Sequence, residues 1–246
     1  MDESAEIFVL VPGPWNDDDE FAEALARAGT GVELDGERVV EPGTGAACAI
    51  KLEGGDYYLR FTFESAGYGK FSPDVLDAIE LHPTTAFLYI AAGYENARVI
   101  ARLTSAVLRA GGIAPVVTSA SVAHTRETWL EQAARDDPAA LYHLFVRLLG
   151  AYNRQHSCGM HNFGLPDAAI PEALGRELAE RVLHPFNLYQ LTERPALENG
   201  ATFAVDDGAL RFRLTHGPDP EPSADSPLRN PFGVWMLHPI DAQERP

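Results

Sequence analysis

The chain has 246 residues, 46% of them hydrophobic and 22% charged, and its formal net charge is −17. This length allows a sizeable core, while the negative charge disfavours nucleic acid and favours a basic protein partner. Two cysteines cannot form a disulfide framework, and no apolar run approaches the ~20 residues of a membrane span. The apolar run near the N-terminus is too short for a signal peptide, so we expect a cytoplasmic protein without a membrane partner.

The first third of the chain alternates between strand and helix patterns. Residues 7–11 are a predicted strand, and Asn16 or Asp17 can cap the helix that follows it. Residues 46–52 and 57–63 are predicted to form two strands, because the four residues between them contain two glycines, which is typical of a hairpin. The prediction is a β-hairpin after the first helix.

A short helix that starts at Ser72-Pro73 leads into a βαβ unit. The run at 84–92 is apolar and rich in β-branched and aromatic residues, as in a strand buried on both faces. Residues 94–110 are a predicted helix, and 113–117 a second strand parallel to the first. The helix has an apolar stripe made of Ala97, Ile100, Leu103 and Val107.

The first six elements match a ferredoxin-like β-α-β-β-α-β order, followed by the further βαβ unit. We therefore expect an α/β (α+β) fold with a mixed sheet. In that sheet, residues 85–91 and 113–117 lie together, and the helix at 94–110 packs across them.

The rest of the chain is predicted to be helical and then mainly β. A helix at 125–135 ends at the Asp-Pro break of 136–138, and an apolar stripe from Leu141 to Tyr152 is typical of an amphipathic helix. Pro171 opens a helix to about residue 183. Strands are expected at 186–191, 202–205 and 210–214. We expect one domain over 1–246, with a possible subdivision near 136–138 and a flexible loop at 217–231.

Four stretches resemble an uncharacterised bacterial family, domain of unknown function 4261. They are residues 108–130 (LRAGGIAPVVTSASVAHTRETWL), Gly159-Met160 with Phe163-Gly164, Pro166-Asp167, and residues 197–202 (LENGAT). The family has no established activity. Some of its relatives look like accessory or immunity-type genes, so the resemblance implies binding to another protein.

The stretch from His156 to His161 has the densest set of reactive side chains. His156, Cys158 and His161 are possible zinc ligands, but a structural zinc site needs four ligands and no second cysteine pair is present. We therefore predict no metal and no cofactor. Cys158 could instead act as a nucleophile with one of these histidines, or with His124 or His143 brought close by the fold.

Two turns are candidate ligand sites. Residues 67–72 resemble a phosphate loop without its spacing, and Lys70 there could meet an anion at the start of a helix. Ser119, Ser121 and His124 follow a predicted parallel strand, where open α/β sheets bind ligands. With Glu127 they would give a serine, histidine and acid set, although helix capping by Ser121 or Thr125 is the simpler interpretation.

Four acidic residues at 17–20 could bind a divalent cation, or could complement the dipole of the helix that they begin. No complete catalytic motif is present. We therefore predict a non-enzymatic interaction domain of accessory or immunity type. The alternative is a small-molecule enzyme with its pocket around Ser119–His124, in which Ser121, His124, Cys158 and His161 are catalytic candidates, and Ser119 and Lys70 are ligand-binding candidates.

Overall fold

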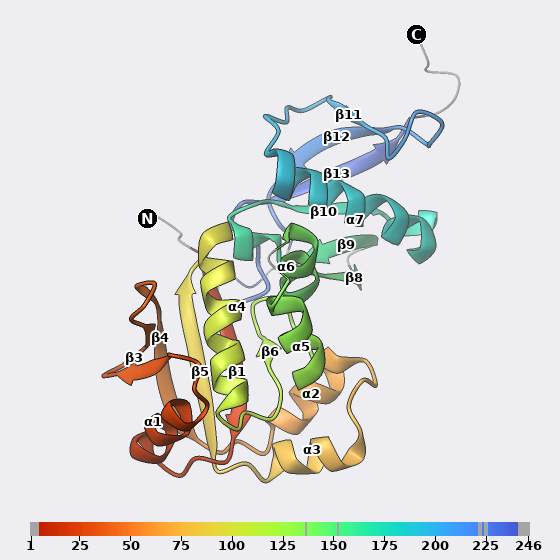
Figure 1. Cartoon of the computed structure of the whole chain (residues 1–246). Helices are drawn as coiled ribbons and strands as arrows, with labels where there is room; N and C mark the ends of the chain where they lie inside the picture. The colour runs from red at the N-terminus through yellow and green to blue at the C-terminus, as the bar shows by residue number, and fades with distance from the viewer. Residues whose placement is uncertain (1–4, 136, 152, 221–222, 224–225, 241–246) are drawn as a thin grey trace. The chain divides into compact units, whose positions relative to one another are not determined.

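The computed structural model describes residues 5–135, 137–151, 153–220, 223 and 226–240. It divides into two compact units, Glu6–Phe145 and Val146–Pro246, the second together with Met1–Ala5. We call them the N-terminal and C-terminal units and describe each by itself (Figure 1). The candidate subdivision near 136–138 includes Asp136, and the loop at 217–231 includes residues 221, 222, 224 and 225, all of which lie outside the described residues.

The N-terminal unit is built on a seven-stranded sheet with the order β2-β3-β4-β5-β1-β6-β7. Strand β1 pairs antiparallel with both β5 and β6, so β5 and β6 run parallel within one sheet, as predicted. The strands are β1 (Glu6–Gly13), β2 (Glu33–Asp35), β3 (Arg38–Glu41), β4 (Ala46–Gly54), β5 (Thr84–Ala91), β6 (Val116–Val117) and β7 (Val122–Ala123).

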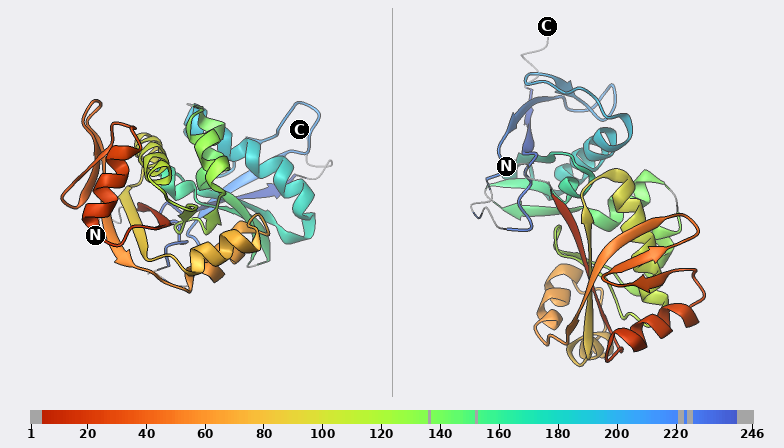
Figure 2. Two further views of the ribbon diagram at one scale, coloured as in Figure 1. Left: turned by 60° about the horizontal axis from the view of Figure 1, so that its bottom comes forward. Right: turned by 90° about the vertical axis from the view of Figure 1, so that its left-hand side faces the viewer.

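Helices cover both faces of this sheet. They are α1 (Asp18–Arg27), α2 (Leu59–Gly67), α3 (Pro73–Glu80), α4 (Tyr94–Arg109), α5 (Arg126–Ala133) and α6 (Pro138–Phe145). Alternate side chains of β1 point to opposite faces. Leu10 packs in a cluster with Leu59 and Phe63 of α2, while Val11 lies against the Gly112 turn that ends α4. The helices α2 and α3 therefore lie on one face and α4 on the other (Figure 2).

The C-terminal unit has a six-stranded sheet with the order β11-β12-β13-β10-β9-β8. Strands β10 and β13 are parallel, and the other neighbours are antiparallel. The strands are β8 (Arg147–Ala151), β9 (Arg154–Cys158), β10 (Asp167–Pro171), β11 (Thr202–Phe203), β12 (Phe212–Gly217) and β13 (Val234–Pro239). The helix α7 (Arg176–Glu193) packs on one sheet face, where Val182, Leu183 and Phe186 join the buried core. Two short 3-10 helices complete the unit, η1 (Met160–Phe163) and η2 (Glu172–Leu174).

The mixed α+β class is confirmed, but the strand predicted at 57–63 is wrong. This segment is helix α2, whose start is fixed by Asp56 Oδ1, which accepts a hydrogen bond from the Tyr58 amide at 2.9 Å. Leu59, Phe63 and Ala66 are buried at helical spacing, which a strand would place on both of its faces. The expected ferredoxin-like order is consequently not formed, because a helix replaces its third strand.

Three further elements differ from the prediction. The apolar stripe that begins at Leu141 is not one helix: α6 ends at Phe145, and β8 follows, with Leu148 against the core. Tyr152 lies outside the described residues. The strand expected at 186–191 is the second half of α7, which continues through Pro185. The helix predicted to open at Pro171 begins instead at Arg176, because Pro171 ends β10.

Candidate functional sites

The turn predicted to be a ligand pocket joins β6 to β7. Ser119 and His124 are buried, each with 1% of its surface exposed, and Ser121 has a left-handed φ of 49°. His124 Nε2 donates to the Leu144 carbonyl oxygen at 3.1 Å, which ties the end of β7 to α6. Glu127 is exposed in the first turn of α5, and Thr125, rather than Ser121, caps that helix. The residues form a compact turn that supports the fold.

His124 is poorly suited to act as a general base. Burial, and then the charge of Lys70, lower its pKa from 6.5 to about 3, so the ring is neutral and weakly basic near pH 7. His143 lies beside it, with ring centroids 5.4 Å apart, and burial also lowers the pKa of His143. We therefore assign the two histidine rings a packing role and no role in proton transfer.

The loop that resembles a phosphate loop follows a helix instead of a strand. Tyr68 ends α2 with a left-handed φ of 51°, and Ser72 accepts from the Val75 amide to cap α3. Lys70 lies exposed in this turn. The acidic run at 17–20 also has a capping role, since Asp17 Oδ1 accepts from the Glu20 amide at 2.8 Å. In both places the contacts are those of helix caps.

The sheet face of the C-terminal unit opposite α7 carries His156 and Cys158. Residues two apart on a strand share a face, and the partner opposite His156 on β8 is Leu149. These side chains line a cavity of about 180 Å³ together with Asp167, Asp219 and Leu228, which also accepts from Cys158 Sγ at 3.9 Å. Burial, followed by the nearby Arg154, lowers the pKa of His156.

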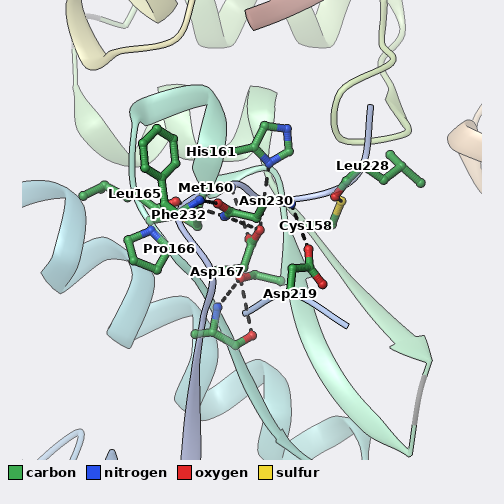
Figure 3. A network of polar contacts seen from close by, with 12 residues as sticks. Cys158, Met160, His161, Leu165, Pro166, Asp167, Asp219, Leu228, Asn230 and Phe232 are labelled. Atoms are coloured by element: carbon green, nitrogen blue, oxygen red, sulfur yellow. Dashed lines mark hydrogen bonds and ion pairs between the residues drawn. The ribbon is translucent and has the colours of Figure 1, made fainter. Parts of the chain in front are cut away.

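Asp167 is the centre of a buried hydrogen-bond network in this unit (Figure 3). Its carboxylate accepts from Ser157 Oγ at 2.8 Å, from the Met160 amide at 3.2 Å and from Asn230 Nδ2 at 2.7 Å. The backbone amide of Asn230 in turn donates a hydrogen bond to Asp219 Oδ2 at 2.8 Å. The network fastens the segment before β13 to the ends of β9 and β10.

His161 lies at the edge of this network. Its Nδ1 is 3.9 Å from Asp167 Oδ2, and neither ring nitrogen has a hydrogen-bond partner within the described residues. The two histidines and Cys158 thus belong to one sheet end, but no group of three or more His, Cys, Asp or Glu side chains in the described ranges could hold a metal ion. His124 and His143 belong to the other unit.

An exposed aromatic surface lies along α2 and at its two ends, and the sequence alone did not predict it. Tyr57, Tyr58, Phe61 and Tyr68 are 56%, 58%, 60% and 60% exposed. We call these four residues the aromatic surface. The wrong assignment of 57–63 as a strand concealed it, because a strand would place Tyr58 and Phe61 on opposite faces, whereas a helical turn places them on the same side. Aromatic residues at helical spacing on both sides of one helix were the available signal.

A second missed feature is a groove beside α4. It has a volume of about 360 Å³ and is lined by Arg98, Arg102, Arg109 and Arg135, with an apolar floor that includes Ala101 and Leu141. The arginines of α4 follow a spacing of four and seven residues, so they lie on one side of the helix. That spacing is visible in the sequence, but the groove depends on where α5 and α6 pack.

No family model matches the chain, and neither the curated proteins nor the solved structures include a significant match. The resemblance to family 4261 therefore stays a prediction. Among the helices that the structure describes, none combines the length and the apolar character needed to cross a membrane.

Proposed function

We propose that the protein is a non-enzymatic cytoplasmic interaction domain, and that its aromatic surface docks a basic segment of a protein partner. The observation that carries this proposal is the exposure of four aromatic side chains on α2 and on the residues that flank its two ends. Contiguous exposed apolar patches are uncommon outside interaction sites. Aromatic side chains are also the residues that most often dominate binding at protein interfaces.

The helix α2 is apolar on two sides for two different reasons. Leu59 and Phe63 hold it to the sheet, so the fold already accounts for that side. Phe61 points away from this cluster and is 60% exposed, while Tyr57 and Tyr58 have ring centroids only 4.1 Å apart. Packing within the unit does not explain this outer stripe, and a partner surface would.

The charge around the aromatic surface selects the type of partner. Between Glu53 and Glu80 the chain has six acidic and two basic residues. One of the two bases, Arg60, is engaged by Glu64, Asp77 and Glu80 at 3.2, 2.6 and 2.7 Å. Lysine and arginine side chains can bind over exposed aromatic faces while nearby carboxylates attract them. A basic segment is therefore the complementary ligand.

A peptide-display selection on the full-length protein tests this proposal. Peptides that bind the wild type, but not a Tyr58→Ser/Phe61→Ser double variant, should carry a net positive charge and should bind less tightly as salt increases. The control is Tyr189→Ser, which removes an aromatic side chain that is 37% exposed in the C-terminal unit. Selected peptides that are neutral or acidic, or that bind the double variant equally well, would contradict the proposal.

The accessory or immunity-type role predicted from the family resemblance fits a partner-binding surface. It adds one requirement, that the partner be a protein encoded with this chain. A pull-down from the native host at low and moderate salt, repeated with the Tyr58→Ser/Phe61→Ser variant, tests that requirement. A neighbouring gene product that is retained by the wild type and lost by the variant is the expected result.

A further inference from the structure

We infer that the arginine-lined groove beside α4 binds a small organic phosphate carrying two or more negative charges. The groove lies within the N-terminal unit, between α4 and the ends of α5 and α6. The groove would bind an anion, whereas the aromatic surface would bind a basic segment, so this inference does not depend on the proposed partner.

The charge in the groove runs against that of the whole chain. The chain has 36 acidic and 19 basic residues, yet four of the residues that line this groove are arginines and none of the lining residues is acidic. A random sample of this surface would be mainly acidic. A local reversal of charge in a concave site raises the local concentration of anions.

The geometry of α4 places three of these arginines along one side of the helix, so all three face the groove. Positions 98, 102 and 109 lie within about 40° of one another around a helix, because 3.6 residues make one turn. Ser105 occupies the remaining position of the same stripe and is 4% exposed. Its hydroxyl donates its one hydrogen to the Ala101 carbonyl oxygen at 2.9 Å, so the arginines are left as the donors for an anion, and its small size leaves room in the groove floor.

The carboxylates that contact these arginines do not fill the groove. Arg98 meets Glu95 at 3.2 Å, Arg102 meets Glu41 at 3.1 Å and Arg135 meets Asp137 at 3.0 Å, in pairs whose arginines are 36%, 47% and 55% exposed. Exposed ion pairs of this kind are weak, and one contact engages only part of a guanidinium's five donors. Arg109 has no ion pair within the described part of the chain. These cations can therefore turn toward a bound anion.

Phosphate is the oxyanion that suits several arginines best, since each forked guanidinium can donate two parallel hydrogen bonds to it. The floor of the groove is apolar: Ala101 and Leu141 are 1% and 6% exposed, and Leu130 and Ala133 lie beside them. A volume of about 360 Å³ exceeds what a single inorganic phosphate fills. The groove thus fits a phosphate group joined to an organic part.

Calorimetric titration of the full-length protein at low ionic strength tests the inference. The probes are inorganic pyrophosphate, as the phosphate-bearing anion, and citrate, as a carboxylate anion of similar charge. Pyrophosphate should bind, and an Arg102→Gln/Arg109→Gln double variant should weaken binding by at least about 100-fold, roughly tenfold for each lost contact to a charged group. Citrate should bind more weakly than pyrophosphate.

Two control variants separate specific recognition from general attraction. Arg27→Gln removes an exposed arginine of the same unit that pairs with Glu23 away from the groove, and it should leave pyrophosphate binding unchanged. Arg102→Lys/Arg109→Lys keeps the charge but loses the forked donors, so it should bind measurably more weakly than the wild type. The inference is overturned by any of three results: no pyrophosphate binding, full binding by the glutamine variant, or citrate binding as tight as pyrophosphate.

Discussion

Replacing Asp167 with asparagine is the most direct perturbation of the C-terminal unit. The carboxylate is 2% exposed and accepts three hydrogen bonds, from Ser157 Oγ, the Met160 amide and Asn230 Nδ2. Asparagine has almost the same shape, so no cavity forms. Its amide nitrogen, however, would face the Asn230 nitrogen, and two donors would then meet 2.7 Å apart.

The size of the loss follows from these contacts. A buried donor left without an acceptor costs about 1–3 kcal/mol, and two bonds that change from charged to neutral acceptors lose about 1 kcal/mol each. Burying an amide costs less than burying a carboxylate, which offsets part of this loss. We expect Asp167→Asn to lower the stability of the C-terminal unit by about 2–3 kcal/mol.

Hydrogen exchange followed by mass spectrometry can measure this loss for each unit separately. Amides of β9 and β10 should exchange about 30- to 150-fold faster, since about 1.4 kcal/mol corresponds to a tenfold change. Amides of α4 should not change. The matched control is Asp207→Asn, an exposed aspartate of the same unit.

A second substitution tests the assignment of donors and acceptors. Asn230→Asp in the Asp167→Asn background restores a donor and acceptor pair, with the orientation reversed, and still accepts from the Phe232 amide, which is 2.8 Å from Asn230 Oδ1. It loses the donor to the Leu165 carbonyl oxygen, so recovery should be partial. Unchanged exchange in β9 and β10 of the single variant, or no recovery in the double variant, would refute this account of the network.

Three further predictions concern stability and metal content. Leu103→Ala should lower the free energy of unfolding by about 2–5 kcal/mol in chemical denaturation, because Leu103 is fully buried; a loss below about 0.5 kcal/mol would contradict its place in the core. Burial lowers the pKa of folded His124 to about 3, below its unfolded value of 6.5, so its stabilising effect is complete above pH 6.5 and falls toward pH 3. His124→Gln should flatten the pH dependence of stability in that window, and an unchanged slope would show that the ring titrates normally. The purified protein should hold no stoichiometric zinc by elemental analysis, whereas one equivalent lost on Cys158→Ser would contradict this expectation.

The sequence predicts the fold best where one periodicity is unambiguous. Residues 94–110 have an apolar stripe and a glycine pair at the end, and the structure has α4 at Tyr94–Arg109. The helix caps at Asp17, Ser72 and Thr125 follow from local hydrogen bonding alone, so they too can be predicted. These elements depend on residues that are close in sequence.

The sequence fails where both periodicities are possible. Tyr57 to Phe63 is aromatic or apolar except at Arg60 and Thr62, so the segment alone does not separate a strand from a helix with an exposed aromatic side. Leu148 and Leu149 continue the helical spacing of α6, yet the strand ladder with β9 determines their conformation. Tertiary pairing overrides local pattern in such segments, and the aromatic surface was lost with the first of these errors.

The buried network around Asp167 could not be predicted for a related reason. Asp167 and Asn230 are 63 residues apart and their contact exists only because β10 and β13 are parallel neighbours. His156, Cys158 and His161 stand out in the sequence because they are close together and chemically reactive. The side chain with most of the contacts at that sheet end is Asp167, which the sequence marked only as part of a Pro-Asp pair.

The two proposed surfaces of the N-terminal unit lie on helices that cover opposite faces of its sheet, α2 on one and α4 on the other. Their charges are opposite, so added salt should weaken binding at both and cannot by itself distinguish them. Substitutions can. Removing the positive charges of Arg102 and Arg109 makes the unit more acidic, so a basic peptide should bind the aromatic surface at least as fast as before. Slower association of that peptide would mean that the groove contributes to its docking, and that the two surfaces are not independent.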